Sequence, residues 1–478
     1  MSSKLDDVLK SMPLAVLLVQ SPRCLAAIAL VFISVSCGSE FPEAVPVEKQ
    51  TATEPTVALT DADLSALGYV DFAEPAEDEL ESGVVHFDRN LSAPGYSLYV
   101  SIPMATAVLI DAEGREVHRW QSNDAKRWVR CELLPDGDVL ILGTLKKASG
   151  PDLSDGFIMR LSWTGTERWT RSLPFHHDLD WDPDGMILAL TQERRELPDN
   201  SNWPAVLDNR VQRIDVNGEL LESHSLTEVL NLKDSLIDLG IEASLESMPE
   251  EDAQVFEDVF AELEAWRATQ PTETANVDAK TATKDKPSPI AEQQSNPSDY
   301  PLDLIHANTV NWISLMDPNS PLFGANVLVT MRHLDVVAAF DWATGQERWR
   351  STEGLLQGPH EANLLTNGNL MIFDNGIRGR GFTRIIELDP RTMSIAWQWQ
   401  ADEPTDFYCR TRGTCQSLEN GNVLIADSEK GAAFEVTRSG EIVWRFFSPI
   451  VDSEGRRGAI RILRYETEFI DKLLQSHN

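Results

Sequence analysis

The sequence has few basic residues for its length. Lysine and arginine number 41 against 76 aspartates and glutamates, which gives a formal net charge of −35 over 478 residues. A protein that binds duplex nucleic acid needs basic surface, so we expect no nucleic-acid partner. A long apolar segment is also missing from the N-terminal region, because the run Leu25–Cys37 is too short for a comfortable membrane span.

Cysteine is scarce, with five in the chain. Cys131 lies in the apolar stretch "VRCELL" and is predicted to be a buried thiol. Cys409 and Cys415 flank "RTRGT", and a loop of that size can close a disulfide in an oxidising compartment. We therefore predict a Cys409–Cys415 disulfide, with a fortuitous pair as the alternative.

The N-terminal region has the features of an export signal. Lys4, Lys10 and Arg23 precede the apolar run, which suits a secretory signal peptide over residues 1–36. The "SVSCGS" that ends the run resembles a bacterial lipobox, although Ser34 stands where leucine is usual. We expect an exported protein, periplasmic or held at the membrane only through a lipid on Cys37; cleavage nearby without a lipid is the alternative.

Residues 37–82 are rich in Pro, Glu, Thr and Ala and are predicted to be a disordered tether.

Two sequence phrases alternate along the chain after this tether. One phrase is a strand, an Asn/Asp-Gly turn and a strand, as in "ELLPDGDVLIL" and "NLLTNGNLMIF". The other is a hairpin that usually ends in tryptophan, as in "LSWTGTERW" and "EVTRSGEIVWRF". One pair occupies about 40 residues, the length of a four-stranded β-propeller blade.

The repeat predicts an all-β, six-bladed β-propeller, because six hairpins of the tryptophan type occur. The first blade is expected near Tyr96–Asp111, and a strand near Arg457–Tyr465 is expected to join it and close the ring. The propeller is assigned to residues 83–223 and 301–465. Between these parts, residues 224–300 are predicted to be an acidic insertion, first helical and then disordered, and residues 466–478 a C-terminal tail.

Histidines recur at one position of the repeat. His177 stands seven residues before Asp184, and His360 seven residues before Asn367. His306 opens the corresponding strand of the blade between them. Since the first strand of a blade lies along the central channel, we expect the three histidines to converge at one mouth of that channel.

Other residues share this predicted position. Val129 and Gly413 occupy it in two further blades. Arg332 ends the inner hairpin that His306 begins, and Asn308 follows His306 by two residues, so both are expected on the same side. Neutral imidazoles beside a guanidinium suit an anionic group such as sulfate or phosphate.

These motifs resemble the bacterial arylsulfate sulfotransferase family. The resemblance covers roughly residues 95–450 apart from the insertion, and it is carried by "AVLIDAEGREVHRW", "DLIHANTVNW", "NVLVTMRHLDVVAAFDWATG", "PHEANLLTNGNLMIFDNG" and "CQSLENGNVLIADSEKGAAFEVTRSGEIVWRF". It implies a six-bladed propeller that moves a sulfuryl group from an aryl sulfate donor to a phenolic acceptor. It also implies a sulfohistidine intermediate, no nucleotide sulfate donor, no cofactor and no metal.

The resemblance also assigns roles residue by residue. His360 matches the family's nucleophile, and His306 and His177 match its helper histidines. Arg332 matches the sulfate-binding arginine, and Asn308 the substrate-binding asparagine of "H-x-N". Glu361 stands where aspartate is expected, which leaves the choice of substrate open.

Four alternatives remain open from the sequence. "DWDPDG" (Asp180–Gly185) begins like a calcium loop, but Thr191 stands where the closing glutamate belongs. The three histidines match a His₃ zinc site, which Arg332 opposes by its charge. A quinone-dependent dehydrogenase propeller would need eight blades and a cofactor motif. A membrane-tethered propeller that binds a partner without catalysis is the main alternative function.

Overall fold

The computed structural model describes residues 81–477, apart from 147–155, 183–184, 197–204, 233–302, 316, 353, 378 and 453–455. All of these residues belong to one compact unit, Glu54–Asn478. The predicted signal peptide, Cys37 and nearly all of the predicted tether lie outside the described residues. In the described part of the chain, no helix is both long enough and apolar enough to cross a membrane.

Six antiparallel sheets make up the fold. We number them as blades and write each from its inner to its outer strand. Blade 1 contains β25 (Ile460–Tyr465), β2 (Tyr96–Ser101), β3 (Thr106–Ile110) and β4 (Glu116–Gln121). Blade 2 contains β5 (Ala125–Leu133), β6 (Val139–Leu145), β7 (Gly156–Leu161) and β8 (Glu167–Ser172). Blade 3 contains β9 (Phe175–Trp181), β10 (Ile187–Glu196), β11 (Ala205–Ile214) and β12 (Leu220–Ser225).

The second half of the chain repeats this plan. Blade 4 contains β13 (Ala307–Trp312), β14 (Val327–Met331), β15 (Val336–Asp341) and β16 (Gln346–Arg350). Blade 5 contains β17 (Pro359–Leu364), β18 (Leu370–Asp374), β19 (Arg384–Asp389) and β20 (Ser394–Trp399). Blade 6 contains β21 (Thr414–Ser417), β22 (Val423–Asp427), β23 (Ala432–Val436), β24 (Ile442–Phe447) and, outermost, β1 (Gly83–Phe87).

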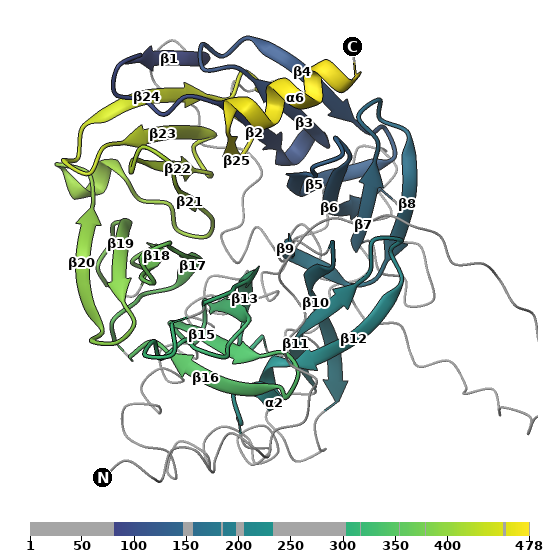
Figure 1. Cartoon of the computed structure of the whole chain (residues 1–478), viewed down its shortest axis with the longest axis vertical. Helices are drawn as coiled ribbons and strands as arrows, with labels where there is room; N and C mark the ends of the chain where they lie inside the picture. Colours follow the sequence, from purple (N-terminus) through teal and green to yellow (C-terminus); the bar gives the residue numbers. More distant parts are fainter. Residues whose placement is uncertain are drawn as a thin grey trace, which may run out of the picture. The chain divides into compact units, whose positions relative to one another are not determined.

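The blades are arranged in a ring, with the innermost strand of each blade nearest the centre (Figure 1). These innermost strands are β25, β5, β9, β13, β17 and β21. Alternating residues of the middle strands pack between neighbouring blades, as in the cluster that joins Leu188 and Val211 to Val310 and Val329. Short helical segments complete the fold: η1 (Ile102–Met104), α2 (Leu226–Val229), η4 (Pro404–Asp406) and α6 (Thr467–His477). The predicted all-β, six-bladed propeller is confirmed.

Both ends of the folded chain close the ring. β25 pairs with β2 from Tyr96↔Tyr465 to Ser101↔Ile460, so the predicted closing strand is present. β1 pairs with β24 and adds a fifth strand to blade 6, which the repeat did not predict. The junction between blades 6 and 1 is therefore secured by two strands from opposite ends of the sequence.

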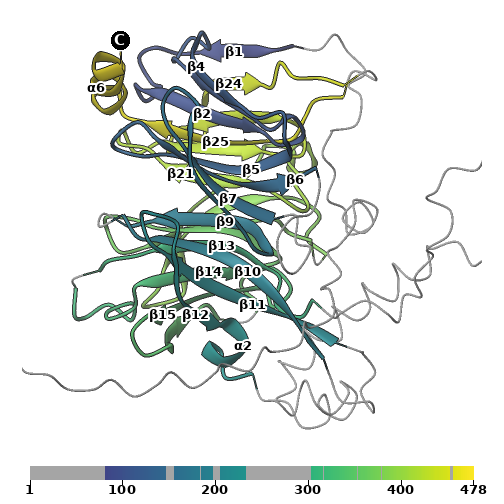
Figure 2. The ribbon, with the colours of Figure 1, turned by 90° about the vertical axis from the view of Figure 1, so that its right-hand side faces the viewer.

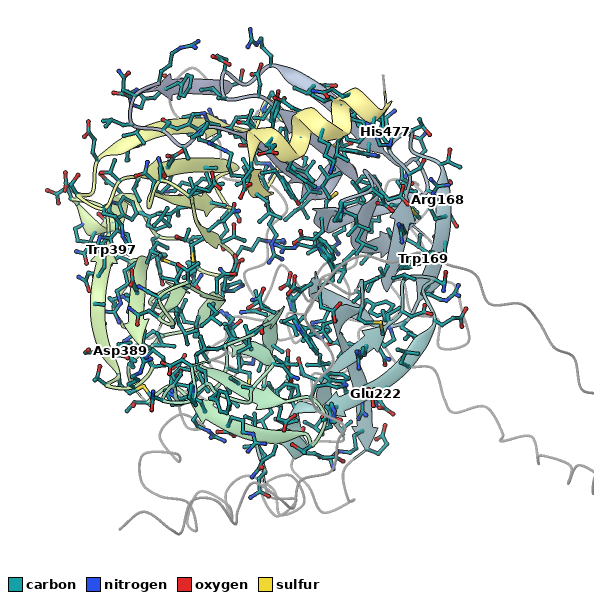
Figure 3. The ribbon with its side chains drawn as sticks, in the orientation of Figure 1. Arg168, Trp169, Glu222, Asp389, Trp397 and His477 are labelled. Carbon is teal, nitrogen blue, oxygen red and sulfur yellow. The ribbon has the colours of Figure 1, made fainter. Side chains whose placement is uncertain are left out.

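The repeated tryptophans connect each blade to the next. The indole N–H of an outer strand donates to a backbone carbonyl in the turn between the third and fourth strands of the following blade. The pairs are Trp120 to Ser162 (3.1 Å), Trp169 to Val216 (3.0 Å), Trp349 to Pro390 (3.0 Å), Trp397 to Arg438 (2.9 Å) and Trp444 to Ala112 (2.9 Å). Figure 3 shows Trp169 and Trp397 on the outer rim, where such a bond is possible.

Blade 3 uses a histidine for the same connection. Its outer strand has no tryptophan, and His224 Nε2 donates to the Trp342 carbonyl at 2.7 Å. The Trp342 indole in turn donates to Glu222 at 2.7 Å. The connection between blades 3 and 4 therefore has the geometry of the others but a different donor.

The sequence boundaries of two segments need correction. Residues 224–232 were predicted to begin the insertion, but β12 runs to Ser225 and α2 packs Leu226 and Val229 into the core. The rest of the predicted insertion, residues 233–300, lies outside the described residues. The predicted tail is the helix α6, whose Ile470 and Leu473 are buried against blades 1 and 2. Both views place α6 beside β2 (Figures 1 and 2).

The predicted Cys409–Cys415 disulfide is wrong. Both residues, like Cys131, are buried free thiols. Hydrogen bonds hold the loop between them: the Asn375 side-chain amide donates to the carbonyls of Cys409 and Arg412, each at 2.7 Å. The prediction used separation along the chain alone, whereas a disulfide also requires a specific distance and orientation of the two Cβ atoms.

Candidate active site

One pocket lies at the centre of the ring, and all six blades contribute to its lining. Its volume is about 410 Å³, including space open to solvent. The lining includes one residue from each of blades 1 to 6, in that order: Ile102, Val129, His177, Asn308, His360 and Gly413. His177 and His360 thus meet as predicted, and Val129 and Gly413, the equivalent positions of other blades, line the same pocket.

Irregularities of strand pairing direct these side chains into the pocket. In β13 and β17 the ladder skips one residue opposite the neighbouring strand, Asn308 and His360 respectively. In β5 it skips two, Lys126 and Val129, of which Val129 lines the pocket. In β9 the skipped residues include His177. A β-bulge leaves a residue unpaired and re-aims its side chain, so these bulges build the site. Strict alternation, from which Asn308 and His306 were expected on one side, does not apply here.

Two of the site histidines have a strained backbone. His177 has φ of 56° and His306 has φ of 49°. Left-handed backbone is unfavourable for residues with a Cβ and persists where the surrounding structure enforces it. Such strain occurs preferentially at functional sites, and here it coincides with the pocket.

His360 is held by two side-chain amides. Its Nδ1 lies 3.2 Å from the amide nitrogen of Asn308 and 3.2 Å from the amide oxygen of Asn375. Asn308 also donates to the Pro359 carbonyl at 3.2 Å. With Nδ1 engaged by these partners, Nε2 is the ring nitrogen available for chemistry.

His306 and Arg332 are buried and are not among the pocket-lining residues. The His306 ring nevertheless contacts the His177 ring, with 4.9 Å between centroids. The Arg332 backbone N–H donates to the His306 carbonyl at 3.0 Å, so the two ends of this hairpin lie side by side as predicted. The Arg332 charge is close enough to lower the pKa of His360.

Asp303 connects this group of buried side chains. Its carboxylate accepts from His306 Nδ1 at 2.5 Å, and its backbone carbonyl accepts from His333 Nδ1 at 2.6 Å. His333 Nε2 then accepts from Arg332 Nη1 at 3.0 Å, because a guanidinium can only donate. His333 is thereby fixed as the neutral imidazole protonated at Nδ1.

Burial favours the neutral forms of His360, His177 and His176. It lowers the pKa of His360 well below 6.5, with Arg332 adding to the effect. Burial likewise lowers the pKa of His177, and that of His176 to about 4. Although burial opposes it, the charge and hydrogen bond of His306 hold the pKa of the Asp303 carboxyl well below its usual range. An ionised carboxylate therefore lies beside the His306 ring.

Two arginines that the sequence reasoning missed also line the pocket. Arg461 comes from β25; its Nη1 donates to the His177 carbonyl at 3.1 Å, and its Nη2 pairs with Asp178 at 2.9 Å. Arg412 comes from the loop before β21. Arg461 thus fixes the strained backbone of His177. Neither residue belongs to the repeated phrases, so no sequence periodicity indicated them.

Asp303, His306 and His333 are close enough together to be considered as a metal site. Their hydrogen bonds fit a metal poorly: both nitrogens of His333 are engaged, one by the Asp303 carbonyl and one by the cationic Arg332. A metal at His333 would have to displace one of these partners.

The calcium-like motif also has another use in this fold. The Asp182 side chain accepts from Met186 N at 2.9 Å, and the Asp180 side chain accepts from Trp312 N at 2.6 Å. Asp182 thus stabilises its own turn, and Asp180 links β9 of blade 3 to β13 of blade 4. Pro183 and Asp184, the middle of the motif, lie outside the described residues.

A family comparison supports the resemblance drawn from the sequence. Residues 130–448 match the model of the arylsulfotransferase (ASST) family. The chain belongs to the arylsulfotransferase family. The match runs from blade 2 through β24 and includes His177, Asn308 and His360. A sulfotransferase with small-molecule substrates is the function class that this membership supports.

Other comparisons give no further information on the function of this chain. No curated protein is significantly similar to the chain. Among solved structures, a protein of unknown function from Bacteroides caccae has 12% identity and a TM-score of 0.41, covering 78% of this chain and 100% of its own. A virginiamycin B lyase from Staphylococcus aureus with quinupristin has 10% identity and a TM-score of 0.39, covering 80% and 96%. Likeness this low supports no functional argument.

Proposed function

We propose that the protein transfers a sulfuryl group from a phenolic sulfate ester to a phenolic acceptor, through a sulfohistidine at His360. The observation that carries the proposal is a neutral, buried imidazole that opens on a pocket beside a guanidinium, in a chain of the arylsulfotransferase family. Imidazole is a good nucleophile when it is neutral, and nearby donors stabilise the sulfuryl oxygens.

In the first half-reaction, His360 Nε2 attacks the sulfur of the donor. An N–S bond forms, the S–O bond to the aryl group breaks, and the phenoxide leaves. The pair His177 and His306 supplies a proton to the phenoxide oxygen. The Asp303 carboxylate accepts from His306 Nδ1 and so fixes the orientation of this ring for the proton transfer.

In the second half-reaction, the acceptor phenol loses its proton to the same pair of histidines. The phenol oxygen attacks sulfur, the N–S bond breaks, and His360 returns to its neutral state. Arg332 and the Asn308 amide are assigned to the sulfuryl oxygens in both steps. Because the donor product leaves before the acceptor reacts, we expect ping-pong kinetics.

The test is to incubate the full chain with 4-nitrophenyl sulfate, without an acceptor, and to analyse it by intact-protein and fragment mass spectrometry. We expect the mass of one sulfuryl group on His360 and a stoichiometric burst of 4-nitrophenol. Added phenol should remove the group and form phenyl sulfate.

Two variants make the test specific. His360→Gln should give neither burst nor label, whereas His86→Gln, at an exposed histidine of β1, should behave as wild type. A folded wild type that never acquires the group would favour the non-catalytic binding propeller. A label on another residue would reject the assignment of His360.

We further propose that the enzyme is exported and attached to a membrane through a lipid on Cys37. The support is the lipobox-like "SVSCGS" after an apolar run. The test is fractionation of a bacterium that expresses the full gene: wild type should sediment with membranes and be released by detergent. Cys37→Ser should be absent from the membrane fraction; equal membrane binding of both proteins would reject the lipid.

A further inference from the structure

The nucleophile assigned above has an ambiguous environment. His360 Nδ1 lies 3.2 Å from a donor, the Asn308 amide nitrogen, and 3.2 Å from an acceptor, the Asn375 amide oxygen. If Nδ1 carries the proton it bonds to Asn375 and leaves a lone pair on Nε2. If it does not, it accepts from Asn308, and Nε2 carries the proton and cannot attack.

Asn375 decides between these two tautomers because its own orientation is fixed. It is fully buried, and its amide nitrogen donates to the carbonyls of Cys409 and Arg412, each at 2.7 Å. Rotating the amide by half a turn would place its oxygen against two carbonyl oxygens. The atom facing His360 is therefore an oxygen, which can only accept.

Asn308 does not compete strongly for Nδ1. Its amide nitrogen has a second acceptor, the Pro359 carbonyl, at the same 3.2 Å. Losing the contact to Nδ1 therefore leaves it paired, whereas an unprotonated Nδ1 would place its lone pair against the Asn375 oxygen in a buried site.

We propose that Asn375 is a positioning residue that holds the proton of His360 on Nδ1 and so makes Nε2 the nucleophile. The proposal rests on the proposed function only in calling His360 a nucleophile. The tautomer itself is a property of the resting protein. It also predicts that Nδ1–H is retained after sulfation. The sulfated ring then keeps a positive charge, which weakens the N–S bond toward the acceptor.

The experiment is ¹⁵N NMR of the full chain labelled with ¹⁵N in its histidine rings. The chain has nine histidines, and the His360 signals are assigned by their loss in His360→Gln. We expect a protonated, pyrrole-type shift at Nδ1 and an unprotonated, pyridine-type shift at Nε2. A pyridine-type Nδ1 in wild type would overturn the proposal. This measurement needs no variant at Asn375 and no enzymatic activity.

Asn375→Leu removes the acceptor and keeps the branching of the side chain. We expect the tautomer population to move toward Nε2–H and kcat to fall by roughly 10²- to 10⁴-fold, the upper value being typical of a catalytic histidine in the wrong tautomer. The KM for 4-nitrophenyl sulfate should change little. Asn375→Asp keeps an acceptor and should retain the pyrrole-type Nδ1, although it is expected to be less stable.

Thr383→Val is the matched control. The Thr383 hydroxyl bonds to the carbonyls of Asn375 and Cys409 in the same buried loop but does not reach His360. It should lose stability without changing the His360 shifts. Wild-type shifts and kcat in Asn375→Leu would overturn the proposal. Correct shifts in a wild type that transfers no sulfuryl group would reject the proposed function alone.

Discussion

Asp303 acts on two histidines through two different oxygen atoms. Its carboxylate bonds to His306 at 2.5 Å, and its carbonyl bonds to His333, which in turn accepts from Arg332. The carboxylate orients the His306 ring, while the carbonyl and Arg332 require a neutral His333. One residue thus gives two neighbouring imidazoles opposite roles, a proton carrier and a support for the guanidinium.

Removing the charge of Asp303 should affect poor leaving groups most. In Asp303→Asn the His306 ring loses the carboxylate that accepts from its Nδ1, so delivery of a proton to the phenoxide becomes harder. We expect the burst rate with phenyl sulfate to fall by roughly 10²- to 10⁴-fold. The rate with 4-nitrophenyl sulfate, whose phenoxide needs little protonation, should fall far less. Equal losses with both donors would contradict this role.

The lowered pKa of His360 predicts an unusual pH profile. Because its pKa lies well below 6.5, the imidazole stays neutral as the pH falls through 6.5. The burst rate should therefore be constant from alkaline pH through 6.5 and decline only at lower pH. Rapid-quench measurement of 4-nitrophenol release tests this, and a midpoint near 6.5 would contradict it.

Protein stability must be followed in the same experiment. Buried histidines with lowered pKa bind fewer protons in the folded than in the unfolded state, so they destabilise the fold as the pH falls below 6.5. Circular dichroism at each pH separates unfolding from protonation of the nucleophile.

The sequence identified the site residues that occupy a repeated position. His177 and His360 stand at equal distances from their turns, and Val129 and Gly413 at the same position proved to line the pocket. Asn375 and Arg461 were missed, because nothing in the spacing of a repeat indicates which loop carbonyls or which closing strand will contact a histidine.

At the scale of the strand, the pocket depends on bulges. The inner hairpins of blades 2 to 5 each carry a register shift at the level of the pocket. The turn phrases predicted these hairpins well, since Asn-Gly and Asp-Gly specify tight turns. A bulge has no comparable signal in a single sequence, so side-chain direction near its position could not be derived from alternation.

The connecting tryptophans allow a matched test of one hydrogen bond. Trp349 donates to the Pro390 carbonyl, whereas the buried Trp128 indole nitrogen has no partner among the described residues. Both Trp349→Phe and Trp128→Phe remove the same ring volume. We expect Trp349→Phe to lose about 1 kcal/mol more free energy of unfolding, the value of the hydrogen bond. Equal losses in urea titrations would show that the bond contributes nothing.

At the scale of the whole molecule, α6 contributes to the core despite its terminal position. Ile470 and Leu473 are buried in the cluster that joins blades 1 and 2. We expect Ile470→Ala to lower the free energy of unfolding by roughly 2–5 kcal/mol. Lys472→Ala, at an exposed position of the same helix, should change it by less than about 0.5 kcal/mol. Similar effects of the two variants would contradict the packing of α6.

The overall fold was largely predictable because its energy is spread over a repeated unit. Each hairpin phrase predicts one part of a blade, and six copies specify the ring. The segments outside the repeat, β1 and α6, were not predicted, because each occurs once and gains its stability from a tertiary contact rather than from a local pattern.

The closing strand has a consequence for how the enzyme matures. Ile460 and Arg461 of β25 form one wall of the pocket, and they follow every other pocket residue in the sequence. A ribosome has therefore made every other residue of the pocket lining before the pocket can be completed. A chain truncated ahead of this strand would lack Arg461 and its contacts to the His177 carbonyl and Asp178, even if its earlier blades had folded.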